Sequence, residues 1–284
     1  MKKIHVILDT DTYNEADDQF ALSYLIRSQD RVVIDAVTVA PYSIPSRGVT
    51  VPEGMELSYH EVLNICRLCG YDCAGKVFRG ASDYMENGCY ADNDAVKAIS
   101  RIANENEKTV ILAIGAITNL GLAFQKDPAL AGKTEVIWLG GNSPETGHNR
   151  EFNFRQDPAA VRAVLESGVK LTVLPCLGVI DALRIPIVEL KSRLGGKSPL
   201  CDYLIGHFCD TGLEGANQSR VIWDISAVAY LLSPEWFETV DRPCPSVEAD
   251  TSYRFPQTGR PVTFAKKVDR AAVYADLFEK LVRI

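Results

Sequence analysis

The 284-residue sequence has no apolar run that approaches the ~20 residues of a membrane-spanning helix, and it has no cluster of basic residues. Its first apolar run, residues 4–8, stops at Asp9 and is too short for the core of a signal peptide. There are 30 lysines and arginines against 37 aspartates and glutamates, a net charge of −7. This balance argues against nucleic acid or an anionic membrane as a partner. We therefore expect a cytoplasmic protein that binds neither.

Eight cysteines are present, and they raise the question of a disulfide framework or a zinc site. A cytoplasmic setting would keep these thiols reduced. Cys66, Cys69 and Cys73 are closely spaced, but no second ligand pair with histidine or cysteine spacing follows them. Cys66 and Cys69 fall on the apolar side of a helical pattern, where cysteine behaves as a small hydrophobe. We expect packing residues rather than a metal site.

Short β-branched runs alternate with helical patterns along the chain, and no repeat, low-complexity tract or linker interrupts them. Such alternation is typical of a parallel sheet whose two faces are covered by helices. We predict a single α/β domain over residues 1–284, with a central, mostly parallel, Rossmann-like sheet flanked by helices. Predicted strands cover residues 4–8, 32–40, 109–115, 136–141 and 171–176; predicted helices cover 17–27, 60–69, 93–105, 119–125, 158–167 and 225–232. Residues 41–57, rich in proline and glycine, are predicted to be a long loop, and residues 243–261 a second irregular region.

Four aspartates, Asp9, Asp11, Asp17 and Asp18, lie at the junction between the first strand and the first helix. At an effective dielectric of ~20, two carboxylates ~5 Å apart repel by about 3 kcal/mol. Several such pairs on one loop require a cation or strongly shifted pKa values, and a hard divalent ion with oxygen ligands is the economical explanation. Helix capping could account for Asp17 and Asp18, but it does not account for the pair at the strand end.

The same segment offers a second interpretation. Asp9-Thr10-Asp11-Thr12 resembles the DxDxT motif of haloacid-dehalogenase-type phosphatases. In that alternative, Asp9 would be the nucleophile that becomes phosphorylated, and Asp11 would act as acid and base. The rest of the chain has to distinguish the two interpretations.

Three further motifs follow predicted strands or precede predicted helices. They are AIGAITNL at 113–120, the pair Gly140-Gly141 followed by EFNF at 151–154 and Asp157-Pro158, and Ile222-Trp223-Asp224 before the last predicted helix. Each has an ordinary structural explanation, because Thr118, Asn119, Asp157 and Asp224 can all begin helices. Glu151 and Asn153, however, could also bind hydroxyl groups from a loop at the end of a strand.

Together, and in this order, the motifs resemble the calcium-dependent nucleoside hydrolase family, also described as inosine–uridine-preferring nucleoside hydrolases. The DxDxxxDD start of that family is similar to Asp9, Asp11, Asp17 and Asp18, and its TGxLTN turn is similar to residues 114–119. Its GG…EFN…DP stretch resembles residues 140–158, and its HDxxAVAYLLDPE segment resembles residues 223–235. A phosphatase accounts for the first motif alone.

The resemblance implies a set of metal ligands and a catalytic base. Asp11 would both bind Ca²⁺ and activate the attacking water. Asp18 would hold the ion with both oxygens, Asp224 would be a further ligand, and the backbone carbonyl of Ile114 would complete the protein ligands. Asp9 would not bind the ion itself but would orient the residues that do.

The resemblance also implies how a nucleoside would be held. Asp17, Glu151 and Asn153 would bind the ribose hydroxyls, and Asn149 would assist them. The activity would be hydrolysis of an N-ribosyl bond to ribose and a free base. Family members commonly form homo-oligomers, so a dimer or tetramer is expected.

Three positions depart from the family pattern. The loop between Asp11 and Asp17 has five residues instead of three, so Asn14 or Glu15 could reach the site. Tyr42 stands where the family has an asparagine. Trp223 stands where many purine-active members carry a histidine that protonates the leaving base, and indole is no acid near neutral pH.

The missing histidine leaves two questions open. Trp223 could stack on a base or pack in the core, and the proton could come from one of four candidate donors: His148, Tyr42, Tyr84 and Tyr90. Alternatively, the substrate has a leaving group that needs less help. The leading hypothesis is therefore a ribonucleoside hydrolase; the alternatives are the phosphatase and a non-catalytic protein that binds ribose or a nucleoside.

Overall fold

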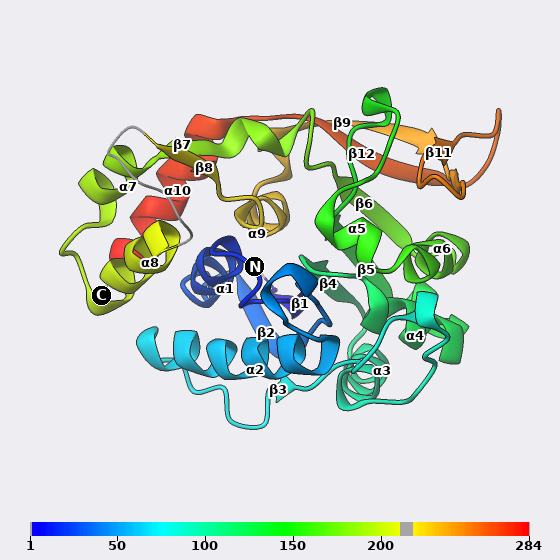
Figure 1. The fold of residues 1–284 in the computed structure, drawn as a ribbon, viewed down its shortest axis with the longest axis horizontal. Helices are drawn as coiled ribbons and strands as arrows, with labels where there is room; N and C mark the ends of the chain where they lie inside the picture. Colours follow the sequence, from blue (N-terminus) through cyan, green and yellow to red (C-terminus); the bar gives the residue numbers. More distant parts are fainter. Residues whose placement is uncertain (1, 211–217, 284) are drawn as a thin grey trace.

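The structure is a computed structural model that describes residues 2–210 and 218–283. Within these residues the largest sheet has eight strands in the order β3-β2-β1-β4-β5-β6-β12-β9 (Figure 1). Neighbouring strands are parallel except at one edge, where β9 runs antiparallel to β12. The predicted α/β class with a mostly parallel sheet is confirmed. The strands are β1 (Ile4–Thr10), β2 (Val32–Val39), β3 (Val77–Phe78), β4 (Thr109–Ala113), β5 (Thr134–Leu139), β6 (Lys170–Leu174), β9 (Phe237–Pro243) and β12 (Pro261–Val268).

Helices cover both faces of this sheet because successive strand residues point to opposite sides. Val6 and Leu8 of β1 enter one hydrophobic cluster, whereas Ile7 between them enters the other. The first cluster includes residues of α1 (Asp17–Ile26), α2 (Val51–Leu68), α7 (Ile187–Leu194), α8 (Pro199–Asp210), α9 (Ile225–Leu232) and α10 (Arg270–Val282). The second includes residues of α3 (Asp94–Glu105), α4 (Thr118–Lys126), α5 (Phe152–Gln156) and α6 (Pro158–Glu166).

The five predicted strands correspond to β1, β2, β4, β5 and β6, and the six predicted helices overlap α1, α2, α3, α4, α6 and α9. The prediction missed β3 at one edge of the sheet, and β9 and β12 at the other. β9 is largely exposed or half-buried and β12 carries two adjacent lysines, so neither presents the continuous apolar run of an interior strand. Helices α5, α7, α8 and α10 were missed as well.

The prediction of an unbroken loop over residues 41–57 was wrong, because α2 begins at Val51 after a short 3-10 turn at Pro45–Arg47. Thr50 and Glu53 form a capping box at its start, with the Thr50 N–H donating to Glu53 Oε2 over 2.9 Å. Pro52 fits the first turn, where its missing N–H costs no hydrogen bond. Gly54 allows a close approach, since a Cβ there would lie 2.2 Å from the Tyr42 carbonyl oxygen.

The remaining elements form two small antiparallel pairs. β7 (Arg184–Pro186) pairs with β8 (Ser219–Val221), and β10 (Ser246–Val247) pairs with β11 (Tyr253–Arg254) inside the region predicted to be irregular. All eight cysteines are free thiols, with Cys66 and Cys69 buried in the first hydrophobic cluster. Among the described helices, none combines the length and hydropathy needed to cross a bilayer.

Candidate active site

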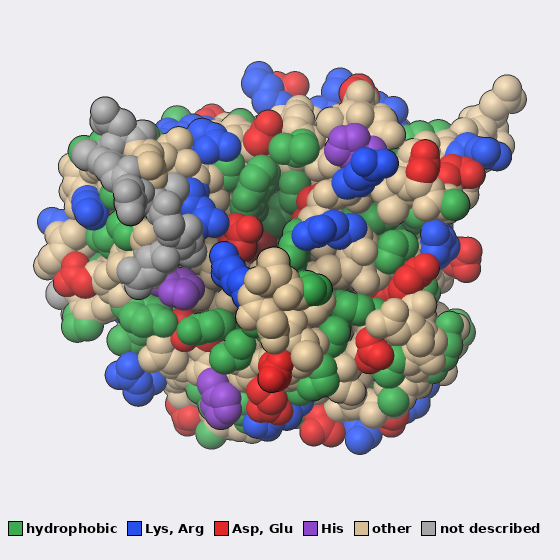
Figure 2. Space-filling model, in the orientation of Figure 1, with side chains coloured by type: hydrophobic (Ala, Val, Ile, Leu, Met, Phe, Trp, Pro, Cys, Tyr) green, Lys and Arg blue, Asp and Glu red, His purple; other side chains and the backbone are tan. Residues whose placement is uncertain are grey.

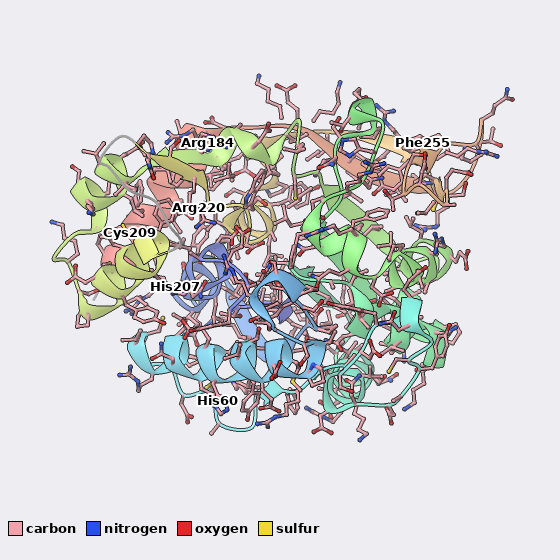
Figure 3. The ribbon with its side chains drawn as sticks, viewed as in Figure 1. His60, Arg184, His207, Cys209, Arg220 and Phe255 are labelled. Atoms are coloured by element: carbon pink, nitrogen blue, oxygen red, sulfur yellow. The ribbon has the colours of Figure 1, made fainter. Side chains whose placement is uncertain are left out.

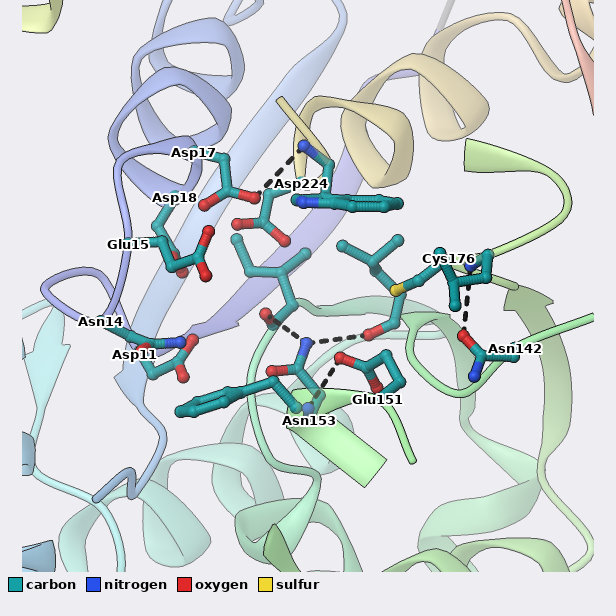
Figure 4. A pocket seen from close by; sticks show the side chains of 15 residues that line it. Asp11, Asn14, Glu15, Asp17, Asp18, Asn142, Glu151, Asn153, Cys176 and Asp224 are labelled. Atoms are coloured by element: carbon teal, nitrogen blue, oxygen red, sulfur yellow. Dashed lines mark hydrogen bonds between the residues drawn. The ribbon is translucent and has the colours of Figure 1, made fainter. Parts of the chain in front are cut away.

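A cavity of about 200 Å³ lies at the carboxyl ends of the central strands, where ligand sites of open parallel sheets occur. It opens near the centre of the face shown in Figure 2, and its lining side chains are drawn in Figure 4. Each part of the lining continues a strand or begins a helix. The segment between β1 and α1 provides Asp11, Asn14, Glu15, Asp17 and Asp18; Ile114 follows β4; Leu139 and Asn142 lie at the end of β5; Glu151, Phe152 and Asn153 start α5; Cys176 and Leu177 follow β6; and Trp223 and Asp224 precede α9.

Three buried carboxylates form the acidic end of the cavity. Asp17, Asp18 and Asp224 each offer an oxygen, and these oxygens all lie within 4.8 Å of one another (Figure 4). Burial raises the pKa of Asp18 to about 6, and it raises those of Asp17 and Asp224 well above their usual range, with neighbouring carboxylates adding to the effect. Buried oxygen ligands that repel one another are the donor set that a hard divalent cation prefers. The residues fit such an ion.

Asp11 lies beside this cluster and is also buried. Its Oδ2 atom has no hydrogen-bond partner among the described residues, which leaves a buried acceptor at the cavity. Burial and the nearby Asp18 and Asp17 raise the pKa of Asp11 well above its usual range. Gly115 makes room for the side chain, because a Cβ at that position would come 3.0 Å from Asp11 Oδ1. The AIG turn after β4 therefore shapes the position of Asp11.

Asp9 lies behind the cavity and does not line it. Its Oδ1 accepts hydrogen bonds from Thr38 Oγ1 (2.6 Å) and Asn119 Nδ2 (2.8 Å), and its side chain is 0% exposed. Desolvation raises the pKa of Asp9 to about 7, although the two donors counter part of the shift. A fully buried carboxylate that is held in this way is not placed to attack a phosphate ester. This position argues against the phosphatase alternative, in which Asp9 is the nucleophile.

Glu151 and Asn153 form the opposite, hydrogen-bonded wall (Figure 4). The Glu151 carboxylate accepts from the backbone N–H groups of Gly141 (2.9 Å), Asn153 (2.7 Å) and Phe154 (3.0 Å), as expected for the residue that caps α5. Asn153 Nδ2 donates to the carbonyl oxygens of Ile114 (2.9 Å) and Leu139 (3.1 Å). These bonds fix both side chains at the carboxyl ends of β4 and β5. The geometry suits groups that orient a hydroxylated ligand.

Two motif residues turn out to be structural. Asp157 caps α6 and accepts from the Met85 N–H (2.9 Å) and Thr118 Oγ1 (2.7 Å), so it ties three segments together. Asn119 joins Asp9 to the Val39 carbonyl oxygen, which it contacts through Nδ2 over 3.0 Å. Neither residue lines the cavity, and both hold the elements that do.

The longer loop after β1 reaches the cavity, as the sequence suggested. Asn14 lies beside Asp11, and Glu15 lies beside the acidic cluster (Figure 4). Glu15 Oε2 pairs with Arg220 Nη2 of β8 over 3.1 Å. On the same side, Trp223 is half-buried, and its backbone N–H donates to Asp17 Oδ2 over 3.2 Å.

Several expected residues lie outside the cavity lining. Asn149 is buried and its amide bridges the Asn142 N–H (2.8 Å) and the Thr251 carbonyl oxygen (2.8 Å), so a substrate contact by Asn149 stays a prediction. His148 is exposed and its Nδ1 contacts neighbouring loop atoms. Tyr42 is buried against α2. Among the other candidate proton donors, Tyr84 bonds to Ser43 Oγ and Gln156 Oε1, and Tyr90 is 60% exposed.

Sequence reasoning assigned no role to Asn142, Phe152, Cys176 and Leu177, although all four line the cavity. Asn142 Oδ1 accepts from the Leu177 N–H over 3.2 Å, which joins the loops after β5 and β6. The sequence did contain a signal for Asn142 and Leu177, because both follow predicted strands. Residues beyond the carboxyl ends of parallel strands line ligand sites.

Comparison with known proteins points to one family. The family model described as inosine-uridine preferring nucleoside hydrolase matches residues 6–275. The pyrimidine-specific ribonucleoside hydrolase RihB of Escherichia coli O1:K1 is 27% identical over 177 residues, which are 58% of this chain and 53% of that protein. The chain thus spans about half the length of the curated relatives it matches.

Solved structures agree in fold. A plant nucleoside hydrolase superposes with a TM-score of 0.80 at 20% identity, with 100% of both chains covered. A purine-preferring ribonucleoside hydrolase from Gardnerella vaginalis superposes with a TM-score of 0.77 at 21% identity, covering 99% of this chain and 98% of the other. At these identities the likeness concerns the fold.

Proposed function

The chain belongs to the inosine-uridine preferring nucleoside hydrolase family, and on that basis we propose that it hydrolyses the N-glycosidic bond of a ribonucleoside or a related N-riboside. The products would be ribose and a free base. The observation that carries the proposal is one cavity with buried carboxylates at one end and the fixed Glu151–Asn153 pair at the other. The first group suits a cation and water activation, and the second suits a sugar.

We propose Ca²⁺ as the ion, with Asp11, Asp18, Asp224 and the Ile114 carbonyl oxygen as its ligands. Asp17 lies in the same cluster of carboxylates, but its Oδ2 accepts from the Trp223 N–H, which favours a role toward the ribose. The two assignments can be separated. Asp18→Asn should abolish the thermal stabilisation by calcium, whereas Asp17→Asn should retain most of it and lose turnover. The opposite pattern would exchange the two roles.

The chemistry follows from what each group can do. Cleavage of an N-glycosidic bond passes through a ribosyl group with oxocarbenium character. A bound calcium ion would orient the attacking water and lower its pKa. Asp11 would accept the proton of that water, because its Oδ2 lies at the cavity without a partner among the described residues. Asp17, Glu151 and Asn153 would hold the hydroxyl groups and exclude bulk water from the ring.

The direct test is ribose release from a panel of nucleosides, with and without a chelator. Asp11→Asn should lower kcat by at least about 1,000-fold while the protein still melts cooperatively. Asp30→Asn is the matched control, because Asp30 is an exposed aspartate outside the cavity lining. Full activity of the Asp11 variant would exclude Asp11 as the base.

Trp223 favours one alternative, a non-catalytic protein that binds ribose or a nucleoside, because indole cannot protonate a leaving base. Tight ribose binding without turnover across the panel would support that alternative. We also propose a homo-oligomer, a dimer or tetramer, which light scattering of the purified protein would measure.

A further inference from the structure

We propose that the preferred substrates are N-ribosides whose base is already a cation, of the N-ribosylpyridinium class, so that the base departs neutral and needs no proton. This inference rests on the proposed N-riboside hydrolysis and deepens it. Three observations carry it: the described part of the cavity lining contains neither histidine nor tyrosine, it is rich in carboxylates, and it contains an indole.

The first observation concerns histidine and tyrosine, neither of which is found among the described residues that line the cavity. His60 lies on the exposed side of α2, and His207 lies on α8 (Figure 3). The Nε2 atom of His207 faces the Glu15 carbonyl oxygen at 3.3 Å, and the His207 ring stacks on Tyr203. His5 pairs with Asp35 at the start of β1, far along the strand from the carboxyl end, and His148 is exposed.

Three carboxylates of the described lining accept hydrogen bonds from other parts of the protein. Glu151 receives three backbone N–H bonds, and Glu15 faces the guanidinium of Arg220. Asp17 accepts from the Trp223 N–H. Each of these three side chains is thus held by donors of the protein itself. Cys176 contributes a thiol to the described lining and is tested below.

The second observation is the charge of the cavity. Its described lining contains no lysine or arginine, but it contains the carboxylates of Asp11, Glu15, Asp17, Asp18, Glu151 and Asp224. One divalent cation would balance two of these charges. A narrow cavity lined by one sign of charge concentrates ligands of the opposite sign. A cationic substrate gains from this field, whereas a neutral nucleoside gains nothing.

The third observation is Trp223, which lines the cavity and is half-buried. An indole is the best aromatic partner for a ligand cation over its face. Trp223, which stands in place of the acidic histidine of purine-active family members, therefore adds affinity for a cationic ring. The loss of the acid and the gain of the indole both favour a cationic base.

The reaction balances without an acid. The C1′–N bond breaks, and its electron pair stays on the ring nitrogen, which changes from a cation to a neutral pyridine. Water oxygen forms the new bond to C1′, and the proton it loses passes to the Asp11 carboxylate and then to solvent. The sum is one riboside cation plus water giving ribose, neutral base and one proton.

The experiment compares kcat/KM of the full chain in calcium buffer for nicotinamide riboside, which is an N-ribosylpyridinium, with inosine and uridine, after subtraction of uncatalysed hydrolysis. Because general acids contribute ~10²–10⁴-fold, the pyridinium riboside should be favoured by about 100-fold or more. Trp223→His should raise kcat for inosine by about 10-fold or more. Trp223→Phe should retain the pyridinium activity better than Trp223→Ala, whose KM should rise.

A binding measurement isolates the charge. On the Asp11→Asn protein, nicotinamide riboside should bind about 10-fold more tightly than its neutral 1,4-dihydro form, which has nearly the same size. Equal affinities would contradict the role of the acidic cavity.

The remaining outcomes separate this inference from the proposed function. If the kcat/KM for inosine or uridine equals that for the pyridinium riboside, the inference fails and the proposed function stands. If His207→Gln or Cys176→Ala then abolishes the hydrolysis of inosine or uridine, the substituted residue is the acid that protonates the leaving base. If no riboside releases ribose, the proposed function fails and this inference falls with it.

Discussion

Removal of divalent cations should destabilise the protein at neutral pH, and calcium should restore its stability. One carboxylate oxygen from each of Asp17, Asp18 and Asp224 lies within 4.8 Å of the other two. At an effective dielectric of ~20, two unit charges at that separation repel by about 3.5 kcal/mol, so three ionised carboxylates store about 10 kcal/mol. The cation-free protein must therefore hold protons on this cluster or lose stability.

The expected size of the calcium effect follows from linkage. A ligand at 100 times its Kd stabilises the native state by about 2.7 kcal/mol. For a chain of this length that corresponds to a rise in Tm of about 5 °C. Calcium should be more effective than magnesium, because a cluster of several carboxylates suits its larger, flexible coordination shell.

The effect should also depend on pH with a definite sign. Burial raises the pKa of Asp18 to about 6 and that of Asp9 to about 7, from an ordinary value of 3.8. Such groups contribute stability that is fully present below pH 4 and is lost as the pH rises through 6 to 7. The chelated protein should therefore melt at a lower temperature at pH 8 than at pH 5.5, and the calcium-induced rise in Tm should grow over the same interval.

Differential scanning calorimetry of chelated and calcium-loaded protein at these two pH values is the assay. Asp18→Asn should lose the calcium response, and Asp30→Asn, which changes an exposed aspartate, should keep it. A Tm that is the same with calcium and with chelator at pH 8 would refute the reasoning, because the carboxylates would then need no cation.

Three further outcomes are expected. Gly115→Ala should lower kcat at least about 10-fold and destabilise the fold by about 1–3 kcal/mol, because the new Cβ would lie 2.8 Å from the Ala40 Cβ and 3.0 Å from Asp11 Oδ1. Gly132→Ala is the control, since no atom lies within 4 Å of its new Cβ, and it should change neither quantity. Steady-state kinetics and thermal melts of the two variants would check both. Asn119→Ala should lower the free energy of unfolding in urea by about 1–3 kcal/mol, because it removes one of the two donors to the buried Oδ1 of Asp9, and an unchanged unfolding midpoint would contradict the role of that bond. 2′-Deoxyribosides should be cleaved at least about 100-fold more slowly than ribosides in parallel assays, because a buried polar group would lose its partner; equal rates would exclude tight recognition of the 2′-hydroxyl.

The interior of the fold could be predicted because its signals are local. β1, β4, β5 and β6 are nearly continuous apolar runs, and such runs identify strands buried on both faces. The edge strand β9 and its neighbour β12 could not be recognised in this way, since their pairing depends on partners distant in sequence. The first turns of α2 were missed because Pro52 and Gly54 were interpreted as loop residues. In the structure, Pro52 lies in the first turn of α2, and Gly54 lies close to the Tyr42 carbonyl oxygen.

The candidate site was predictable in part. The predicted residues Asp11, Asp17, Asp18 and Asp224 meet at the cavity, together with Glu151, Asn153 and Trp223. Asn149 and Tyr42 are not among the residues that line the cavity, and their roles toward a substrate stay predictions. Their positions depend on how loops fold back: Asn149 bonds to Asn142 and Thr251, and Tyr42 packs on α2. Spacing along a chain locates residues at strand ends well, and it says little about where a long loop directs a side chain.

Hydrolysis in ¹⁸O-labelled water tests the central claim most directly. The account predicts that calcium-loaded protein converts an N-riboside to free base and ribose that carries one ¹⁸O atom, and that Asp11→Asn and chelation each abolish the labelled ribose. No release of ribose from the cationic or the neutral ribosides, or release that persists unchanged in the Asp11 variant, would contradict it.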